Sequence, residues 1–194
     1  MVMPSPATRW TREMVLALPD DGNRYELFDG ELLVTPAPSA GHQWAVAALF
    51  ARLLRYLEGT GIAFVCTSPA DLRLEGGQIA QPDLFVIPPR PDGSRPARWE
   101  DFAIPLLVVE VLSPSTAPAD RITKRRRYQR TRVPEYWVVD RYAQVVERWR
   151  PGEERPEILD ERLVWEPVAG VPPLVIDLAE MFRDVPREAE GPGS

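Results

Sequence analysis

The longest helical pattern in the chain covers residues 39–59, where apolar side chains recur at a spacing of three or four positions. Ser39 can cap the first turn through its hydroxyl oxygen, and Gly59 or Gly61 can end the last turn. One side of this predicted helix carries Trp44, Ala48, Leu53, Leu54 and Leu57. We therefore expect a helix that packs this side against the rest of the protein.

A second helical segment, residues 118–132, is dominated by charged side chains. Shorter helices are expected within residues 5–20, ending near Pro19, and at the end of residues 172–182. We expect the segments 39–59 and 119–131 to flank a sheet.

Runs of apolar and β-branched residues predict that sheet. Residues 24–36 read as a hairpin around Asp29-Gly30, a pair that favours a two-residue turn. The other predicted strands lie within residues 61–68, 71–75, 82–87, 104–113, 134–140, 144–150 and 162–168. Gly76-Gly77 is expected to turn the chain before residues 82–87, and the Pro- and Arg-rich residues 88–102 to form an exposed loop.

Strand, helix and strand follow one another between residues 104 and 140. This order predicts a crossover connection between two parallel strands, of which residues 104–113 are covered on both faces. The expected fold class is α/β or α+β, with a mixed β-sheet flanked by helices.

Length and composition favour one domain spanning residues 1–194, with a core over about 24–182 and a disordered tail at 187–194. No apolar stretch approaches the roughly 18 residues of a membrane span, and the first residues lack a signal-peptide pattern. The single cysteine, Cys66, excludes an internal disulfide and is expected to be an inert core residue. These features predict a cytoplasmic protein.

The net charge of −6 gives no general attraction to nucleic acids or anionic membranes, although a local basic surface remains open. Of the 23 Lys and Arg residues, Lys124 alone is a lysine. Because a planar guanidinium poorly replaces a compact ammonium, a retained lysine is a hint of chemistry.

Glu110 lies within the stretch 106–116, LLVVEVLSPST, where large aliphatic side chains flank it on both sides. Burying an ionised carboxylate costs several kcal/mol unless it is paired, neutralised or bound to a cation. Asp83 follows Pro82 at the start of another predicted strand, so the two carboxylates can converge at one end of the sheet. Grouped carboxylate oxygens suit Mg²⁺ or Mn²⁺. The alternative is that Glu110 pairs with an arginine or turns to solvent.

Asp120, Lys124 and Tyr128 are spaced four apart and therefore stack on one helical face. Lys124 could reach over the sheet end toward the carboxylates and act on water or phosphate. Alternatively, Asp120 and Lys124 form a surface ion pair worth at most about 0.5 kcal/mol. The basic run 124–132 can bind a nucleic-acid backbone or form a solvated face.

Together these segments resemble a known family. The stretches QPDLFVI, VVEVLSPST, DRITKRRRYQRTRVPEYWVVD and YELFDGELLVTPAPSAGHQ are similar to Uma-type restriction endonucleases of the PD-(D/E)XK nuclease superfamily. The likeness runs from Arg24 to Leu178. It implies a restriction-endonuclease-like core of three layers with a metal site at one edge of the sheet.

The resemblance also assigns roles to residues. Asp83 and Glu110 would be the two metal-binding acids. The lysine expected two residues after the second acid is replaced by Leu112, and Lys124 from the following helix would substitute.

Four further positions are candidates for the same site. The resemblance suggests that Glu31 could supply a further metal-binding carboxylate. His42, the only histidine, could line the site or be a hydrogen-bonded structural residue of its helix. Asp120 and Tyr128 share the helical face of Lys124 and complete the candidate set.

These residues predict an Mg²⁺-dependent endonuclease, with Mn²⁺ as a possible substitute, that hydrolyses DNA. Asp83 and Glu110 would bind the cation, and Lys124 would orient water or neutralise a phosphate oxygen. The expected partners are DNA and a second copy in a homodimer, and no membrane. Two alternatives stay open: a catalytically inactive nuclease-fold module for DNA binding or assembly, and a glycoside hydrolase with paired carboxylates.

Overall fold

A mixed six-stranded sheet forms the frame of the protein, in the strand order β10-β9-β8-β7-β6-β3. The computed structural model describes residues 9–74, 78–113 and 116–186. The six strands are β3 (Phe64–Thr67), β6 (Leu84–Ile87), β7 (Leu107–Val111), β8 (Glu135–Asp140), β9 (Val145–Trp149) and β10 (Glu157–Leu159). β7 and β8 are parallel, which confirms the predicted crossover, and the other neighbouring pairs are antiparallel.

Two smaller sheets lie beside this frame. One has the order β2-β1-β5-β4 and the other pairs β11 with β12. Their strands are β1 (Arg24–Phe28), β2 (Glu31–Thr35), β4 (Leu72–Leu74), β5 (Gln78–Ala80), β11 (Arg162–Trp165) and β12 (Leu174–Asp177). The predicted hairpin is confirmed as β1 and β2, with Asp29 at φ 52° and Gly30 at φ 87° in its turn.

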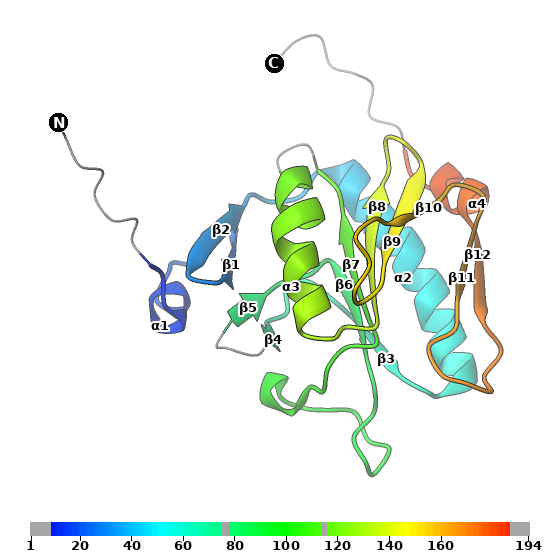
Figure 1. The fold of residues 1–194 in the computed structure, drawn as a ribbon, viewed down its shortest axis with the longest axis horizontal. Helices are drawn as coiled ribbons and strands as arrows, with labels where there is room; N and C mark the ends of the chain where they lie inside the picture. Colours follow the sequence, from blue (N-terminus) through cyan, green and yellow to red (C-terminus); the bar gives the residue numbers. More distant parts are fainter. Residues whose placement is uncertain (1–8, 75–77, 114–115, 187–194) are drawn as a thin grey trace, which may run out of the picture.

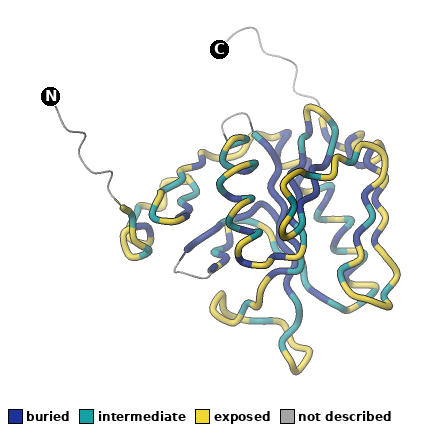
Figure 2. Tube along the Cα trace, in the orientation of Figure 1, coloured by how far each residue is buried: buried dark blue, intermediate teal, exposed yellow. Residues whose placement is uncertain are grey.

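Helices cover both faces of the six-stranded sheet (Figure 1). They are α1 (Arg12–Leu16), α2 (Ala40–Thr60), α3 (Arg125–Arg130) and α4 (Leu178–Arg183), with a 3₁₀ turn at Trp99–Asp101 and a π-helical segment at Ala119–Lys124. α2 and α4 pack on one face, and α3 packs on the other. Burial is concentrated along the sheet strands (Figure 2). The predicted mixed sheet flanked by helices is therefore confirmed.

Several local predictions differ from the structure. Strands β5, β10 and β12 were not expected. β5 and β10 have three residues each and carry almost no periodic signal, and β12 lies in the segment 172–182, where only a short helix was predicted. The predicted loop 88–102 is mostly exposed but contains the 3₁₀ turn. The Gly76-Gly77 turn and the predicted tail at 187–194 lie outside the described residues.

The limits of α2 agree with the sequence, but its buried side does not. The Ser39 hydroxyl accepts a hydrogen bond from the His42 backbone N–H at 3.3 Å, and Gly61 ends the helix at φ 67°. The residues that α2 buries are Gly41, His42, Ala45, Val46, Leu49, Leu53 and Leu57. The placement of Trp44 on the packed side was wrong, because its side chain is 56% exposed.

The difference in burial between Leu53 and Trp44 on α2 can be tested by substitution. Leu53 is fully buried in the core under α2. Leu53→Ala should lower the free energy of unfolding by about 2–5 kcal/mol, because it removes buried methyl groups and leaves a cavity. Trp44→Ala should change it by less than about 0.5 kcal/mol. Urea unfolding followed by circular dichroism measures both, and equal losses would contradict the burial described here.

The segment predicted as one charged α-helix consists of two parts. In the first part the chain forms a wide π-helical turn, in which the backbone N–H of Arg125 bonds to the carbonyl of Asp120 five residues earlier. The second part is α3. Asp120 and Lys124 in the wide turn are both buried, although the surrounding sequence is strongly charged. Turns of this kind occur frequently at functional sites.

Candidate active site

Glu110 lies inside the protein on β7, with 2% of its surface exposed. Alternation along the strand places it on the same face as Val108 and Leu112, toward α3. Its Oε1 accepts hydrogen bonds from Lys124 Nζ at 3.0 Å and from the Tyr128 hydroxyl at 3.4 Å. The alternative in which Glu110 pairs with an arginine or turns to solvent is therefore wrong.

Lys124 is the centre of a buried group of charges. Besides Glu110, its Nζ lies 2.8 Å from Glu26 Oε2 and 3.2 Å from Asp120 Oδ1. Its side chain is 3% exposed, so the interpretation of Asp120 and Lys124 as a surface ion pair is wrong. We refer to these residues as the Lys124 cluster: Glu26, Glu110, Asp120, Lys124 and Tyr128.

The electrostatics of this cluster follow from burial and crowding. Burial raises the pKa of Glu110 well above its ordinary value, and the carboxylates of Asp120, Asp83 and Glu26 raise it further against the opposing charge of Lys124. Burial would lower the pKa of Lys124, but Glu110, Glu26 and Asp120 raise it well above its ordinary value. The ammonium therefore stays protonated, whereas burial and mutual repulsion disfavour the charged forms of Glu110 and Asp120.

Asp83 lies at the sheet end in a second group with Arg24 and His42. Its Oδ1 accepts a hydrogen bond from Arg24 Nη1 at 2.6 Å, and its Oδ2 lies 3.0 Å from His42 Nε2. The backbone N–H of Val111 donates to Oδ2 at 2.8 Å. Burial would raise the pKa of Asp83, but the hydrogen bond to His42, together with Arg24 and Val111, lowers it to about 2. Asp83 is therefore a carboxylate at neutral pH.

Strands β1 and β7 join the two groups. Val111, which binds Asp83, directly follows Glu110 on β7. On β1, Arg24 and Glu26 are two residues apart and so point to the same side; Arg24 reaches Asp83 and Glu26 reaches Lys124. Glu26 Oε1 also accepts a hydrogen bond from the backbone N–H of Gln81 at 2.8 Å. The structure thus brings Asp83, Glu110, Lys124, His42, Asp120 and Tyr128 to one end of the sheet.

One candidate is misplaced and two neighbours were missed. Glu31 is exposed at the start of β2, paired with Phe28 across the hairpin, so it does not belong to this site. The missed carboxylate is Glu26, which is fully buried. Glu26 stands between Tyr25 and Leu27, and a carboxylate between large apolar residues is the signal that identified Glu110. The same reasoning could have found Glu26. Arg24, the second missed residue, has no distinguishing sequence signal.

The oxygen donors at this site have the chemistry that a divalent cation needs. Four buried carboxyl groups face two permanent cations, Arg24 and Lys124, so a bound divalent cation would stabilise the charged carboxylate forms that burial and mutual repulsion disfavour. Oε2 of Glu26 and Oδ1 of Asp120 have no well-aligned hydrogen-bond donor. No group of three His, Cys, Asp or Glu side chains is already arranged around one point within the described residues. The donor type and charge fit Mg²⁺ or Mn²⁺, and binding would require the ammonium to give up part of its contacts.

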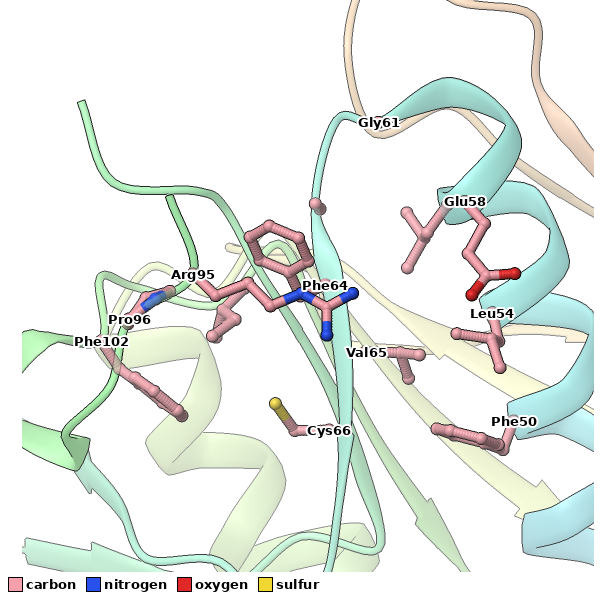
Figure 3. Close-up of a pocket in the computed structure, with 13 residues that line it drawn as sticks. Phe50, Leu54, Glu58, Gly61, Phe64, Val65, Cys66, Arg95, Pro96 and Phe102 are labelled. Atoms are coloured by element: carbon pink, nitrogen blue, oxygen red, sulfur yellow. The ribbon is translucent and has the colours of Figure 1, made fainter. Parts of the chain in front are cut away.

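A cavity of about 510 Å³ gives access to the Asp83 end of the site. Arg24, His42 and Asp83 line it together with the start of β1 and the middle of α2. A different cavity, of about 490 Å³, lies along the edge strand β3 (Figure 3). It is lined mainly by apolar side chains, with Arg95 and Glu58 as its charged residues, and it contains none of the clustered carboxylates.

Cys66 lines this second cavity and is half-buried, so its placement in the core was only partly right. Burial raises the pKa of its thiol, which agrees with an inert cysteine.

The chain matches a known protein family and is similar to a solved structure. Residues 12–179 match the Uma2 family, described as "Putative restriction endonuclease". The chain is also similar to a crystal structure described as "a putative nuclease belonging to DUF820" from Anabaena variabilis ATCC 29413, with a TM-score of 0.72 and 20% identity over 91% of this chain and 99% of that chain. At that identity the likeness shows the fold alone. None of the curated proteins matches the chain. Among the described residues, no helix has both the length and the apolar character needed to cross a membrane.

Proposed function

Because this chain belongs to the Uma2 family, whose description is "Putative restriction endonuclease" and whose match spans residues 12–179, we propose that it hydrolyses phosphodiester bonds in DNA with the help of Mg²⁺ or Mn²⁺. The family and the fold indicate a restriction-endonuclease-like nuclease. The cation requirement and the choice of DNA are our proposal. The observation that supports it best is the group of buried carboxylates around Lys124 and Asp83 at one end of the sheet.

In the proposed reaction, Asp83 and Glu110 would hold the cation. A bound Mg²⁺ would make a coordinated water more acidic and stabilise the negative charge that develops on the phosphate. Lys124 stays protonated because its carboxylate neighbours raise its pKa, so it serves as a hydrogen-bond donor and not as a base. Its ammonium can orient the attacking water or stabilise a phosphate oxygen. Tyr128 and Asp120 hold Glu110 and Lys124 in position through the contacts described above.

The first test is cleavage of supercoiled plasmid and of linear duplexes by the purified protein. We expect cleavage with Mg²⁺ or Mn²⁺, none with EDTA, and recovery when the metal is added back. Asp83→Asn should reduce the rate by about 100-fold or more, because it removes a charged metal ligand. Unfolding curves of the variant check that the fold is retained. Equal cleavage in EDTA, or by Asp83→Asn, would contradict the proposal.

One observation favours the inactive nuclease-fold module as a second candidate. The Lys124 ammonium already lies among the carboxylates, and the described residues contain no ready-made group of three metal ligands. Calorimetric titration with Mn²⁺ distinguishes the two candidates. A nuclease should bind Mn²⁺ through Asp83 and Glu110, whereas an inactive module should bind DNA equally well when both residues are changed to alanine.

A further inference from the structure

A third cavity, smaller than the two described above, adjoins the Asp83 group and has no role in the proposed reaction. Its volume is about 260 Å³, compared with roughly 30 Å³ for one water molecule. The polar residues that line it are Arg24, Thr35, Ser39, His42, Ser113, Arg141 and Tyr142. Arg24 and His42 also line the larger cavity that reaches Asp83, so the two cavities share a wall.

Arg141 and Tyr142 are presented to this cavity by a fixed turn at the end of β8. Oδ1 of Asp140 accepts hydrogen bonds from the backbone N–H groups of Tyr142 at 3.0 Å and Ala143 at 2.9 Å. Oδ2 of Asp140 is held by Arg121 at 3.0 Å. Arg141 is 8% exposed; its Nη2 donates a hydrogen bond to the Tyr142 hydroxyl at 2.5 Å, and its guanidinium carbon lies 4.1 Å from the centre of the Tyr142 ring. Tyr142 itself is 56% exposed.

The polar atoms around this cavity suit an anion. Two arginines from distant parts of the chain, Arg24 and Arg141, meet here. Arg24 and His42 line both cavities, and Nε of Arg24 and Nδ1 of His42 have no hydrogen-bond partner among the described residues, although these two atoms themselves have almost no accessible surface. The N-terminal end of α2, capped by Ser39, adds partial positive charge. Because the whole chain has a net charge of −6, attraction for a polyanion must come from such local sites.

We propose that this cavity binds a backbone phosphate of the DNA strand next to the phosphate that enters the Asp83 cavity. Arg141 contacts the phosphate oxygens, and the exposed ring of Tyr142 stacks on an adjoining base. The subsite rests on the proposed function, because it names how that substrate is held. Contacts of this kind fix the position of a strand without reading its sequence.

The test is the salt dependence of DNA binding, measured by fluorescence anisotropy with a labelled oligonucleotide in EDTA, where no metal-dependent cleavage occurs. Arg141→Gln should weaken binding about tenfold or more and reduce the slope of log K against log salt by about 0.7–0.9, the contribution of one phosphate contact. Tyr142→Ala should weaken binding to single-stranded DNA about fivefold or more and leave the slope unchanged. Arg55→Gln, an exposed arginine on α2, is the charge-matched control and should behave as wild type.

The outcomes separate this subsite from the nuclease reaction. If Arg141→Gln binds DNA with the affinity and salt slope of Arg55→Gln, the subsite is wrong even when the wild-type protein cleaves DNA. The wild-type protein could bind DNA, and Arg141→Gln could bind it more weakly as expected, while the wild-type protein cleaves no DNA with Mg²⁺. In that case the subsite is supported and the proposed hydrolysis is wrong. If the wild-type protein does not bind DNA, the subsite is overturned, and the plasmid assay decides separately on cleavage.

Discussion

Lys124→Met is expected to lower the free energy of unfolding by about 3–5 kcal/mol and to abolish DNA cleavage. The substitution leaves Glu26, Glu110 and Asp120 buried without the ammonium that lies 2.8 to 3.2 Å from each of them. The loss therefore comes mainly from uncompensated buried carboxylates and not from lost packing. Urea unfolding in EDTA measures the stability, and the plasmid assay with Mg²⁺ measures the activity.

Arg126→Met is the matched control for this experiment. Arg126 is exposed on α3, two residues from Lys124, and its loss should change the free energy of unfolding by less than about 0.5 kcal/mol. If Lys124→Met proves no less stable than Arg126→Met, the carboxylates do not depend on the lysine, and the arrangement described for the Lys124 cluster is wrong.

Glu110→Gln should leave the free energy of unfolding nearly unchanged and still strongly reduce DNA cleavage. Burial and neighbouring carboxylates raise the pKa of Glu110, so the fold disfavours its charged form. Because the isosteric amide removes that charge, the metal-free protein should keep its free energy of unfolding to within about 1 kcal/mol or gain stability. DNA cleavage should fall by about 100-fold to 1000-fold, since a charged ligand for the cation is lost. The same unfolding and plasmid assays measure both effects.

Glu31→Gln is the control for Glu110→Gln. Glu31 is an exposed carboxylate that the resemblance to the family suggested as a further metal ligand and that the structure places outside the site. Its substitution should leave cleavage at the wild-type rate. A large loss of activity in Glu31→Gln, or full activity in Glu110→Gln, would contradict the assignment of the site to the buried carboxylates.

The sequence predicts best those site residues whose charged side chains would cost much free energy to bury without a partner. A carboxylate inside an apolar strand, as at Glu110, is too expensive to leave unexplained. A lone lysine among arginines, as at Lys124, is rare enough to attract attention. The hairpin turn at Asp29-Gly30 and the ends of α2 were also predictable, because caps and tight turns depend on local chemistry.

Features set by tertiary packing were not predictable in this way. Glu26 and Glu31 lie on the same face of the hairpin, because Glu31 pairs with Phe28 and Glu26 is two residues before Phe28. They differ in position along the hairpin: Glu26 is buried in the middle of β1, next to the residue that pairs with the three-residue strand β5, whereas Glu31 is exposed beside the turn. Trp44 fits a helical stripe as well as His42 or Ala45 does, and only the packing of α2 decides between them. The π-helical turn that buries Asp120 is not marked by any residue type in the sequence.

The most direct measurement is a crystal structure of the protein soaked in Mn²⁺, with anomalous diffraction used to locate the metal. A cation ligated by Asp83 and Glu110, with the Lys124 ammonium within a few ångströms, is the expected result. Anomalous density bound elsewhere, or none at this end of the sheet at millimolar Mn²⁺, would contradict metal-dependent catalysis at these carboxylates.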